Sequence, residues 1–274
     1  MPELPEVETV KNELTPYVVG RKITDVVLLW AGIVKEPSPE EFRRRLIGQK
    51  ITGLTRRGKY LPFSLSGGDT LIAHLKMTGS LLVEKDGAEP PKYARAVFHL
   101  DNDTDIVFRD PRKFGVLRLV KDRNSVIGKL GPEPFDDEFT SKRLGEILLK
   151  RKTPVKALLC EQELIAGIGS MYADEALFAT KIHPMRPGTS LTEKEIKNLH
   201  KAILRILSAA IENKGASVDT YYRPDGSRGT AHYQFKVAHR FKESCYTCGT
   251  PIERIKVRQR GSYFCPKCQP EPKA

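Results

Sequence analysis

The stretch CYTCGTPIERIKVRQRGSYFCPKC, residues 245–268, decides the fold of the C-terminal end of the chain. It contains two C-x-x-C pairs, Cys245 with Cys248 and Cys265 with Cys268, which sixteen residues separate. In a chain that we expect to be cytosolic, this spacing predicts a four-thiolate zinc site rather than disulfides. Because four protein ligands leave no open coordination position, one structural Zn²⁺ is predicted.

The residues between the two cysteine pairs have the pattern of a β-hairpin. Apolar residues alternate at Ile252, Ile255 and Val257, a turn is expected near Gly261, and apolar residues resume at 263–264. Four cations project from this ribbon, whose width suits a nucleic-acid groove: Arg254, Lys256, Arg258 and Arg260. The fifth cysteine, Cys160, is interpreted as a buried core thiol.

Composition favours a nucleic-acid partner. The 274 residues carry a net charge of +12, and residues 151–274 contribute +9 of it, with 21 Lys and Arg against 12 Asp and Glu. A polyanion is the expected partner, and no basic amphipathic helix points to a membrane surface instead. The N-terminus lacks a secretion signal and no apolar stretch is long enough to cross a membrane, so we expect the cytoplasm.

The order of the predicted elements indicates an α+β protein. Short β-rich runs with turn residues between them continue to about residue 121, and helical patterns begin at 141. The segment LGPEPFDDEFT, 130–140, is rich in proline and acid and reads as a linker. The predicted domains are an N-terminal β domain over 1–129, the linker 130–140, a helical domain over 141–236 and a zinc finger over 237–274.

Two segments have both a structural and a functional interpretation. In AGIGSMYADEALF, 166–178, Gly167, Gly169 and a helix beginning near Met171 fit a phosphate site, but also an ordinary glycine turn. The start, MPELPEVETV, has Pro5 and two acidic residues placed as in an ordinary helix start. That interpretation leaves Pro2 unexplained, since removal of Met1 would give it a free secondary amine next to Glu3.

The whole chain resembles the bacterial formamidopyrimidine-DNA glycosylases, base-excision repair enzymes that remove oxidised purines. The resemblance rests on motifs in the family's order: PELPEVET at the start, RRGKYL at 56–61, HLKMTGSL at 74–81, RDPRKFG at 109–115, LGPEP at 130–134, AGIGSMYADEALF and the four-cysteine finger. It implies a β-sandwich N-terminal domain and a helical domain with a helix-two-turn-helix element that ends in the zinc finger.

The same resemblance implies four catalytic residues. Pro2 is the nucleophile, whose amine attacks C1′ of the damaged nucleotide and forms an iminium with the opened sugar. Glu3 is the proton donor to the sugar ring oxygen. Lys59 contacts the flanking phosphate and donates a proton in β-elimination, and Arg260 grips phosphate and assists δ-elimination.

The implied DNA contacts include three residues that fill the gap left by the everted nucleotide: Met77, Arg112 and Phe114. The other implied DNA-contacting positions are His74, Tyr93, Arg151, Gly169 and Ser170. A loop over 215–236, here the capping loop, corresponds to the family segment that covers the flipped base. The implied partner is double-stranded DNA with a damaged base, bound by a monomer.

The chain departs from the family pattern at three places. Ser170 stands where the family has Asn, Tyr93-Ala94-Arg95 replaces His-Asp-His, and Ala238-His239-Arg240 replaces Tyr-Gly-Arg. These changes concern affinity and lesion preference, which the sequence leaves open. Two other functions are also considered: an endonuclease VIII-like glycosylase for oxidised pyrimidines, and a lesion-binding protein without catalysis.

Overall fold

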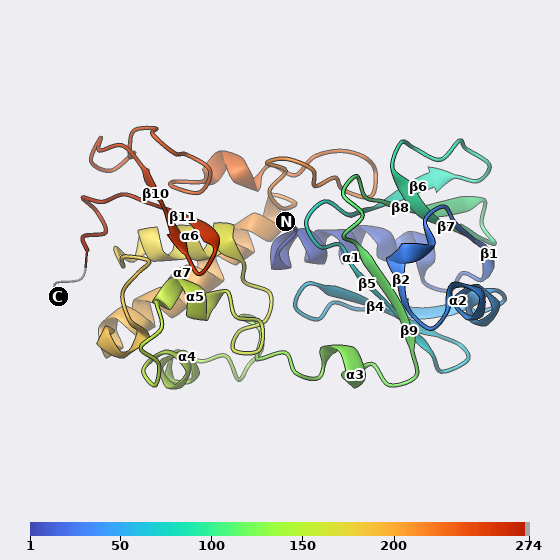
Figure 1. Cartoon of the computed structure of the whole chain (residues 1–274), viewed down its shortest axis with the longest axis horizontal. Helices are drawn as coiled ribbons and strands as arrows, with labels where there is room; N and C mark the ends of the chain where they lie inside the picture. The colour runs from blue at the N-terminus through green and yellow to red at the C-terminus, as the bar shows by residue number, and fades with distance from the viewer. Residues whose placement is uncertain (272–274) are drawn as a thin grey trace. The chain divides into compact units, whose positions relative to one another are not determined.

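The computed structural model describes residues 1–271, which form two compact units (Figure 1). The first unit contains Met1–Lys129 and Ile211–His232, and the second contains residues 130–210 and 233–271. Within the described residues, no helix is long and apolar enough to cross a membrane. The domain boundaries predicted at residues 129, 140 and 236 stay a prediction. The two units are defined by packing contacts, and each of them contains two separate segments of the chain.

Two β-sheets make up most of the first unit. The four-stranded sheet has the order β1-β7-β8-β6 and the five-stranded sheet the order β2-β9-β5-β4-β3, in which β2 and β9 are the parallel pair. The strands of the first sheet are β1 (Ile23–Leu28), β6 (Ser80–Lys85), β7 (Ala94–Leu100) and β8 (Thr104–Arg109). Those of the second are β2 (Val34–Glu36), β3 (Ile51–Leu54), β4 (Tyr60–Leu65), β5 (Thr70–His74) and β9 (Val116–Val120).

One hydrophobic core joins the inner faces of these two sheets. Phe98 and Phe108 of the first sheet lie in the same cluster of buried residues as Phe63 and Leu117 of the second. Helix α1 (Leu4–Val18) adds an apolar stripe to this core, and its Val7, Val10 and Leu14 are completely buried. The result is the β-sandwich that was expected for the N-terminal half. The short helices α2 (Pro39–Leu46), η1 (Ala31–Ile33) and α3 (Asn124–Ile127) connect its parts.

Helices dominate the second unit: α4 (Ser141–Leu148), α5 (Val155–Leu159), α6 (Ser170–Ala179) and α7 (Glu193–Glu212), with short turns η2 (Gly188–Ser190) and η3 (Ala231–Gln234) near them in the chain. Helix α7 begins with a capping box, since the Thr192 N–H donates to Glu195 and the Glu195 N–H donates back to Thr192. Helix α5 ends at Leu159, because turns follow Cys160.

The C-terminal segment forms the expected hairpin of β10 (Glu253–Val257) and β11 (Arg260–Phe264). The expected turn near Gly261 is wrong: Gly261 pairs with Lys256 inside the ladder, and the turn residues are Arg258 and Gln259, with φ of 42° and 65°. Positive φ at both central residues is the type I′ geometry that matches the twist of a two-stranded ribbon. The turn therefore lies two to three residues before Gly261, and Arg260 belongs to the strand.

Candidate active site and DNA interface

The first residues of the chain are fixed by the start of α1. Pro2 is buried and Glu3 is only 2% exposed. Glu3 lies at the N-cap position, and its backbone N–H donates to Oε2 of Glu6 over 2.7 Å. A capping box of this kind satisfies backbone donors that the first helical turn leaves without intrahelical partners. Glu3 therefore belongs both to an ordinary helix start and to the predicted catalytic pair.

The Glu6 carboxylate also connects the N-terminus with the capping loop. Glu6 is fully buried, and its second oxygen, Oε1, accepts the Ala216 N–H over 2.7 Å. Gly215 precedes that contact with φ of 77°, and a Cβ there would approach the Glu6 side chain to 2.9 Å. Glycine is thus needed at 215 both for its conformation and for the close approach. Sequence analysis used Glu6 only as a first-turn acid and missed this contact.

Lys59 lies in a two-residue turn next to α1. Arg57 and Tyr60 exchange backbone hydrogen bonds of 3.0 and 2.9 Å, and Gly58 between them has φ of 56°. Arg56 links this turn to the helix, because it donates to the Glu8 carboxylate over 2.7 Å and to the Gly58 carbonyl over 3.1 Å. Lys59 itself is 5% exposed. The first unit therefore places Lys59 on a turn that is tied to the helix that begins with Pro2 and Glu3.

The Glu8 carboxylate in this link is ionised at neutral pH. Burial opposes its ionisation, but hydrogen bonds from Lys11 and Arg56, together with their charges, lower the pKa of Glu8 below its usual value. A charged Glu8 strengthens the hydrogen bond to the Arg56 guanidinium, since charge-assisted bonds are the stronger class.

His74 lies at the end of β5, opposite Tyr60 of β4. Burial, with the nearby charges of Lys76 and Lys59, lowers the pKa of His74 to about 3, so its imidazole is neutral at physiological pH. Its Nδ1 accepts the Lys76 N–H over 2.9 Å, which assigns the ring proton to Nε2. His74 is therefore a neutral hydrogen-bond donor beside Lys59.

The three predicted gap-filling residues come together in the first unit. The Arg112 guanidinium lies 4.6 Å from the centre of the Phe114 ring, and its Nη1 approaches the Met77 sulfur to 3.7 Å. Phe114 is 45% exposed and Met77 is 43% exposed. Folding does not explain why two large apolar side chains are exposed next to each other. Such an exposed apolar cluster indicates a surface that binds another molecule.

Asp110 holds the wedge loop, which we define as residues 110–115. This fully buried carboxylate accepts the N–H groups of Arg112, Phe114 and Gly115 over 3.2, 2.7 and 2.6 Å. The Thr78 hydroxyl, next to Met77, donates to the same carboxylate. One charge therefore fixes both segments that present Met77, Arg112 and Phe114. Sequence analysis missed Asp110, although an Asp-Pro pair before a glycine is a turn signal.

The second unit contains the predicted phosphate site at the start of α6. Gly169 is the N-cap and Ser170 the first residue of the helix. The Ser170 hydroxyl donates to the Gly261 carbonyl over 2.9 Å, and Lys156 Nζ donates to the Ser170 carbonyl over 2.6 Å. Since a serine hydroxyl has one proton, Ser170 uses it to join α6 to the zinc-finger hairpin.

A buried ion pair strengthens that junction. Lys156 and Asp174 are paired, each side chain is 1% exposed, and Ser262 of β11 donates to the same Asp174 carboxylate over 2.7 Å. On the next residue, the Glu175 carboxylate accepts the N–H groups of residues 236–238, each over 2.9 Å. Removal of one partner from a buried pair is costly, so these contacts fix the hairpin on α6. Sequence analysis had not identified them.

The four cysteines form one cluster at the base of this hairpin. The sulfur separations are 3.9 Å for Cys245 with Cys268, 3.4 Å for Cys248 with Cys265 and 3.6 Å for Cys248 with Cys268. A tetrahedral zinc site with Zn–S bonds of about 2.3 Å requires sulfur separations of roughly 3.8 Å. The cluster therefore fits the metal, and Cys160 lies apart from it as a buried free thiol.

Two of the predicted phosphate-contacting arginines lie near the same end of the second unit. Arg260 is exposed on β11, and its Nη1 approaches the Cys160 carbonyl to 3.5 Å. Arg151 follows α4 and donates to the Ile147 carbonyl over 2.5 Å. Arg258, at the hairpin turn, donates to Thr153 just after Arg151 over 3.2 Å. The hairpin and the end of α4 thus share a basic surface.

Comparison with known proteins assigns all three parts of the chain. Residues 1–117 match the formamidopyrimidine-DNA glycosylase N-terminal domain, residues 130–222 its H2TH domain, and residues 242–270 the zinc finger found in FPG and IleRS. The chain belongs to the formamidopyrimidine-DNA glycosylase family. The resemblance and the α+β fold class are confirmed, as is the structural Zn²⁺ of the four-cysteine finger.

Full-length relatives support the assignment. Formamidopyrimidine-DNA glycosylase from Symbiobacterium thermophilum is 44% identical, over 99% of this chain and 90% of its own length. The Chloroflexus aurantiacus enzyme is 44% identical, over 98% of each. The G226P mutant of Lactococcus lactis FPG, solved with DNA that contains Fapy-dG, has a TM-score of 0.92 and 37% identity, over 98% of this chain and all of that one.

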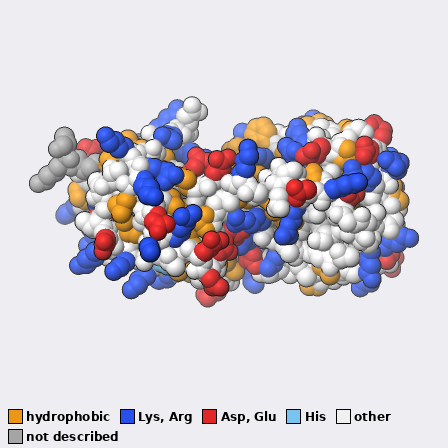
Figure 2. All heavy atoms as spheres, turned by 90° about the horizontal axis from the view of Figure 1, so that it is seen from below, with side chains coloured by type: hydrophobic (Ala, Val, Ile, Leu, Met, Phe, Trp, Pro, Cys, Tyr) orange, Lys and Arg blue, Asp and Glu red, His pale blue; other side chains and the backbone are white. Residues whose placement is uncertain are grey.

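This chain is thus a formamidopyrimidine-DNA glycosylase with abasic-site lyase activity, which binds damaged double-stranded DNA and acts on formamidopyrimidine and oxidised-purine lesions. Lys and Arg side chains are spread over the surface of both units, with acidic side chains between them (Figure 2). The distribution fits a glycosylase whose substrate is a polyanion.

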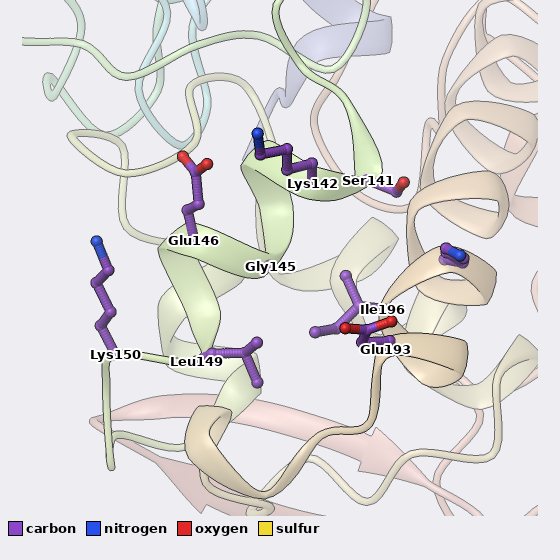
Figure 3. Close-up of a pocket in the computed structure, with 9 residues that line it drawn as sticks. Ser141, Lys142, Gly145, Glu146, Leu149, Lys150, Glu193 and Ile196 are labelled. Atoms are coloured by element: carbon purple, nitrogen blue, oxygen red, sulfur yellow. The ribbon is translucent and has the colours of Figure 1, made fainter.

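A hollow of about 450 Å³ in the second unit belongs to helix packing rather than to this chemistry. Helix α4 and the start of α7 line it, and Leu149 and Ile196 form its apolar floor (Figure 3). None of the glycosylase site residues predicted from the sequence is among its lining residues.

Proposed function

We propose that Pro2, after removal of Met1, is the nucleophile of this glycosylase. Its secondary amine attacks C1′ of the damaged nucleotide, the C1′–base bond breaks, and the departing base takes up the proton that the amine nitrogen loses. Glu3 protonates the sugar ring oxygen as the ring opens to the iminium. Since α-amino groups titrate near ~7.7–8, a useful fraction of the amine is unprotonated at neutral pH.

The iminium then acts as an electron sink for strand cleavage. A proton leaves C2′, and the 3′ phosphate is expelled by β-elimination with Lys59 as the proton donor. The 5′ phosphate leaves by δ-elimination, which Arg260 assists. An iminium from a secondary amine has no N–H proton to lose, so it keeps the positive charge that makes the neighbouring C–H acidic.

The observation that carries this proposal is the position of Glu3 at the capped start of α1. Its carboxyl is part of a buried helix start, and that start is joined through Glu6 to Ala216 in the capping loop. Catalytic groups act best when they are preorganised, and this arrangement fixes Glu3 before substrate binds. Lys59 is fixed to the same helix through Arg56 and Glu8.

We further propose that Met77, Arg112 and Phe114 fill the gap left by the everted nucleotide. His74, Tyr93, Arg151, Gly169 and Ser170 are assigned to the DNA-contacting surface. For Ser170 the contact with Gly261 indicates that it acts by joining α6 to the hairpin that carries Arg260. The proposed enzyme is a cytoplasmic monomer that works on the chromosome, with its domains divided at 129, 140 and 236.

The test is borohydride trapping on a duplex with 8-oxoguanine opposite cytosine. Pro2→Gly, and a second variant with Ala inserted between Met1 and Pro2, should lose covalent trapping while duplex affinity stays within a few-fold of wild type. The matched control is Pro39→Gly, a proline at the start of α2 outside the proposed site. Trapping of either Pro2 variant at the wild-type level would remove Pro2 from the mechanism.

A further inference from the structure

Tyr222 of the capping loop docks on the outer face of the four-stranded sheet. Its ring packs against the buried cluster formed by Leu82, Ala94, Val97 and Val107. Arg109, the last residue of β8, places its guanidinium carbon 5.3 Å from the centre of the Tyr222 ring. Arg228, from the same loop, approaches the ring to 5.4 Å. Tyr222 thus has an apolar contact and two cationic ones.

The same Arg109 guanidinium contacts a second ring. It lies 5.6 Å from the centre of the Tyr93 ring, which Lys92 also approaches to 5.1 Å. The rings of Tyr93 and Tyr222 are therefore bridged by one cation. Tyr93 stands where the family pattern has a histidine, so this chain supplies one half of the bridge through its own departure from that pattern.

Hydrogen bonding does not explain the position of Arg109. Its Nη1 is buried and, among residues 1–271, has no hydrogen-bond partner. The same holds for Oγ of Ser80, the residue paired with Arg109 across the β6–β8 ladder. A buried donor without a partner is unfavourable, and what the guanidinium gains in return is its contact with two aromatic rings.

The backbone at Tyr93 is held in an unusual conformation. Its φ of 73° lies in the left-handed region, which is rare for an aromatic residue. Its carbonyl accepts the Asp110 N–H over 2.9 Å, so the wedge loop fixes Tyr93 in place. Tyr93 and Arg109 are therefore a rigid platform on which the loop's Tyr222 rests.

We propose that Arg109 is a positioning residue that closes the capping loop by binding Tyr222 against Tyr93. This inference rests on the proposed function only in that the loop covers the everted base. A lesion that retains its base needs the cap, whereas an abasic site has no base to cover. Arg109 should therefore matter for base excision and not for cleavage of a preformed abasic site.

The experiment compares Arg109→Ala, Arg109→Lys and Tyr222→Leu with wild type. Single-turnover rates are measured on a duplex with 8-oxoguanine opposite cytosine and on one with a preformed abasic site opposite cytosine. Docking of the loop is measured separately, on the free enzyme, as the rate of tryptic cleavage after Arg228. Arg44→Ala, an exposed arginine of α2, is the matched control.

Arg109→Ala should slow excision about 3- to 30-fold, the range expected for loss of cation–π contacts, with abasic-site cleavage within two-fold of wild type. Tryptic cleavage of the loop should rise by a similar factor. Arg109→Lys keeps the charge but not the planar guanidinium. It should slow excision less than Arg109→Ala does, again with abasic-site cleavage within two-fold of wild type. This variant keeps the test valid if the alanine variant unfolds. Tyr222→Leu removes the other ring of the bridge and should likewise slow excision while abasic-site cleavage stays within two-fold of wild type.

Equal losses on both substrates, or unchanged tryptic cleavage of the loop, would overturn the inference. Failure of the proposed function would give a different result. Borohydride would then not trap the wild-type enzyme at Pro2, while tryptic cleavage would still report docking of the capping loop.

Discussion

The wedge loop and residues 215–232 of the capping loop belong to the same unit, yet they are fixed in opposite ways. The wedge loop depends on one fully buried carboxylate, Asp110, which accepts three backbone N–H groups. The capping loop is attached at scattered points: Ala216 to Glu6, Arg223 to Glu13, and the Pro224 carbonyl to the Val83 N–H over 2.8 Å. A concentrated anchor makes a segment rigid, whereas dispersed contacts let it open while the rest stays folded.

This difference fits what each loop does in a base-excision enzyme. The wedge must offset the cost of extruding a nucleotide, so it is effective only if its side chains are already in place. The cap must admit the nucleotide and then cover it, so it must move. The 3.4 Å hydrogen bond from Thr220 to the Met77 carbonyl shows that the capping loop also touches the segment that presents Met77.

The largest effect is expected for Asp110→Ala. It removes the acceptor for buried N–H groups, and each such unsatisfied donor costs about 1–3 kcal/mol, so the free energy of unfolding should fall by roughly 3–5 kcal/mol. Urea unfolding measures this loss. Asp110→Asn retains one oxygen and should lose less, and Asp101→Ala, at an exposed aspartate, should stay within about 0.5 kcal/mol. A loss below about 1 kcal/mol for Asp110→Ala would refute the single-anchor view.

Next in size is Arg112→Ala, which tests whether the rigid loop also selects the opposite base. A guanidinium can donate two hydrogen bonds to the acceptor edge of cytosine, whereas adenine places a donor there. The preference for 8-oxoguanine opposite cytosine over adenine should narrow by about 1–3 kcal/mol in single-turnover excision.

The control for Arg112 is its neighbour Lys113, a cation of the same loop that lies over the Trp30 ring, 5.6 Å from its centre. Lys113→Ala should leave the base preference unchanged. If Arg112→Ala lowered both rates equally, the arginine would only prop the helix open, and selectivity would reside elsewhere.

Sequence patterns predicted the structural features that depend on residues close together along the chain. The zinc cluster follows from cysteine spacing, and α1 and α4 follow from apolar periodicity with capping residues. The hairpin was predicted as well, but its turn was placed at the glycine instead of at Arg258 and Gln259, two residues that seldom take positive φ.

Contacts between distant segments could not be predicted in this way. Glu6 meets Ala216 across 210 positions, and Asp174 accepts hydrogen bonds from Lys156 and Ser262, which lie on two other elements. In a sequence, a buried carboxylate that accepts backbone N–H groups is indistinguishable from a solvated one. Asp110 and Glu175 were missed for that reason, although both fix segments that carry predicted site residues.

The smallest effect concerns Glu13→Gln, which removes the charge that pairs with Arg223 of the capping loop. The side chains of this pair are 20% and 24% exposed, so its loss should change the free energy of unfolding by no more than about 1 kcal/mol. The effect of this substitution on amide hydrogen exchange should be easier to detect than its effect on stability. Salt screens exposed charges, so in wild type we expect amide hydrogen exchange in residues 216–228 to accelerate between low and high ionic strength.

In Glu13→Gln the exchange of these amides should already be fast and insensitive to salt. The Phe114 and Gly115 amides, which donate to Asp110, should stay slow in both proteins at every salt concentration, because their acceptor is buried. Glu89→Gln, at an exposed position of the β6–β7 connection, should resemble wild type. If the wedge amides accelerated together with the capping-loop amides, the two loops would open as one unit, and the contrast between a concentrated and a dispersed anchor would be wrong.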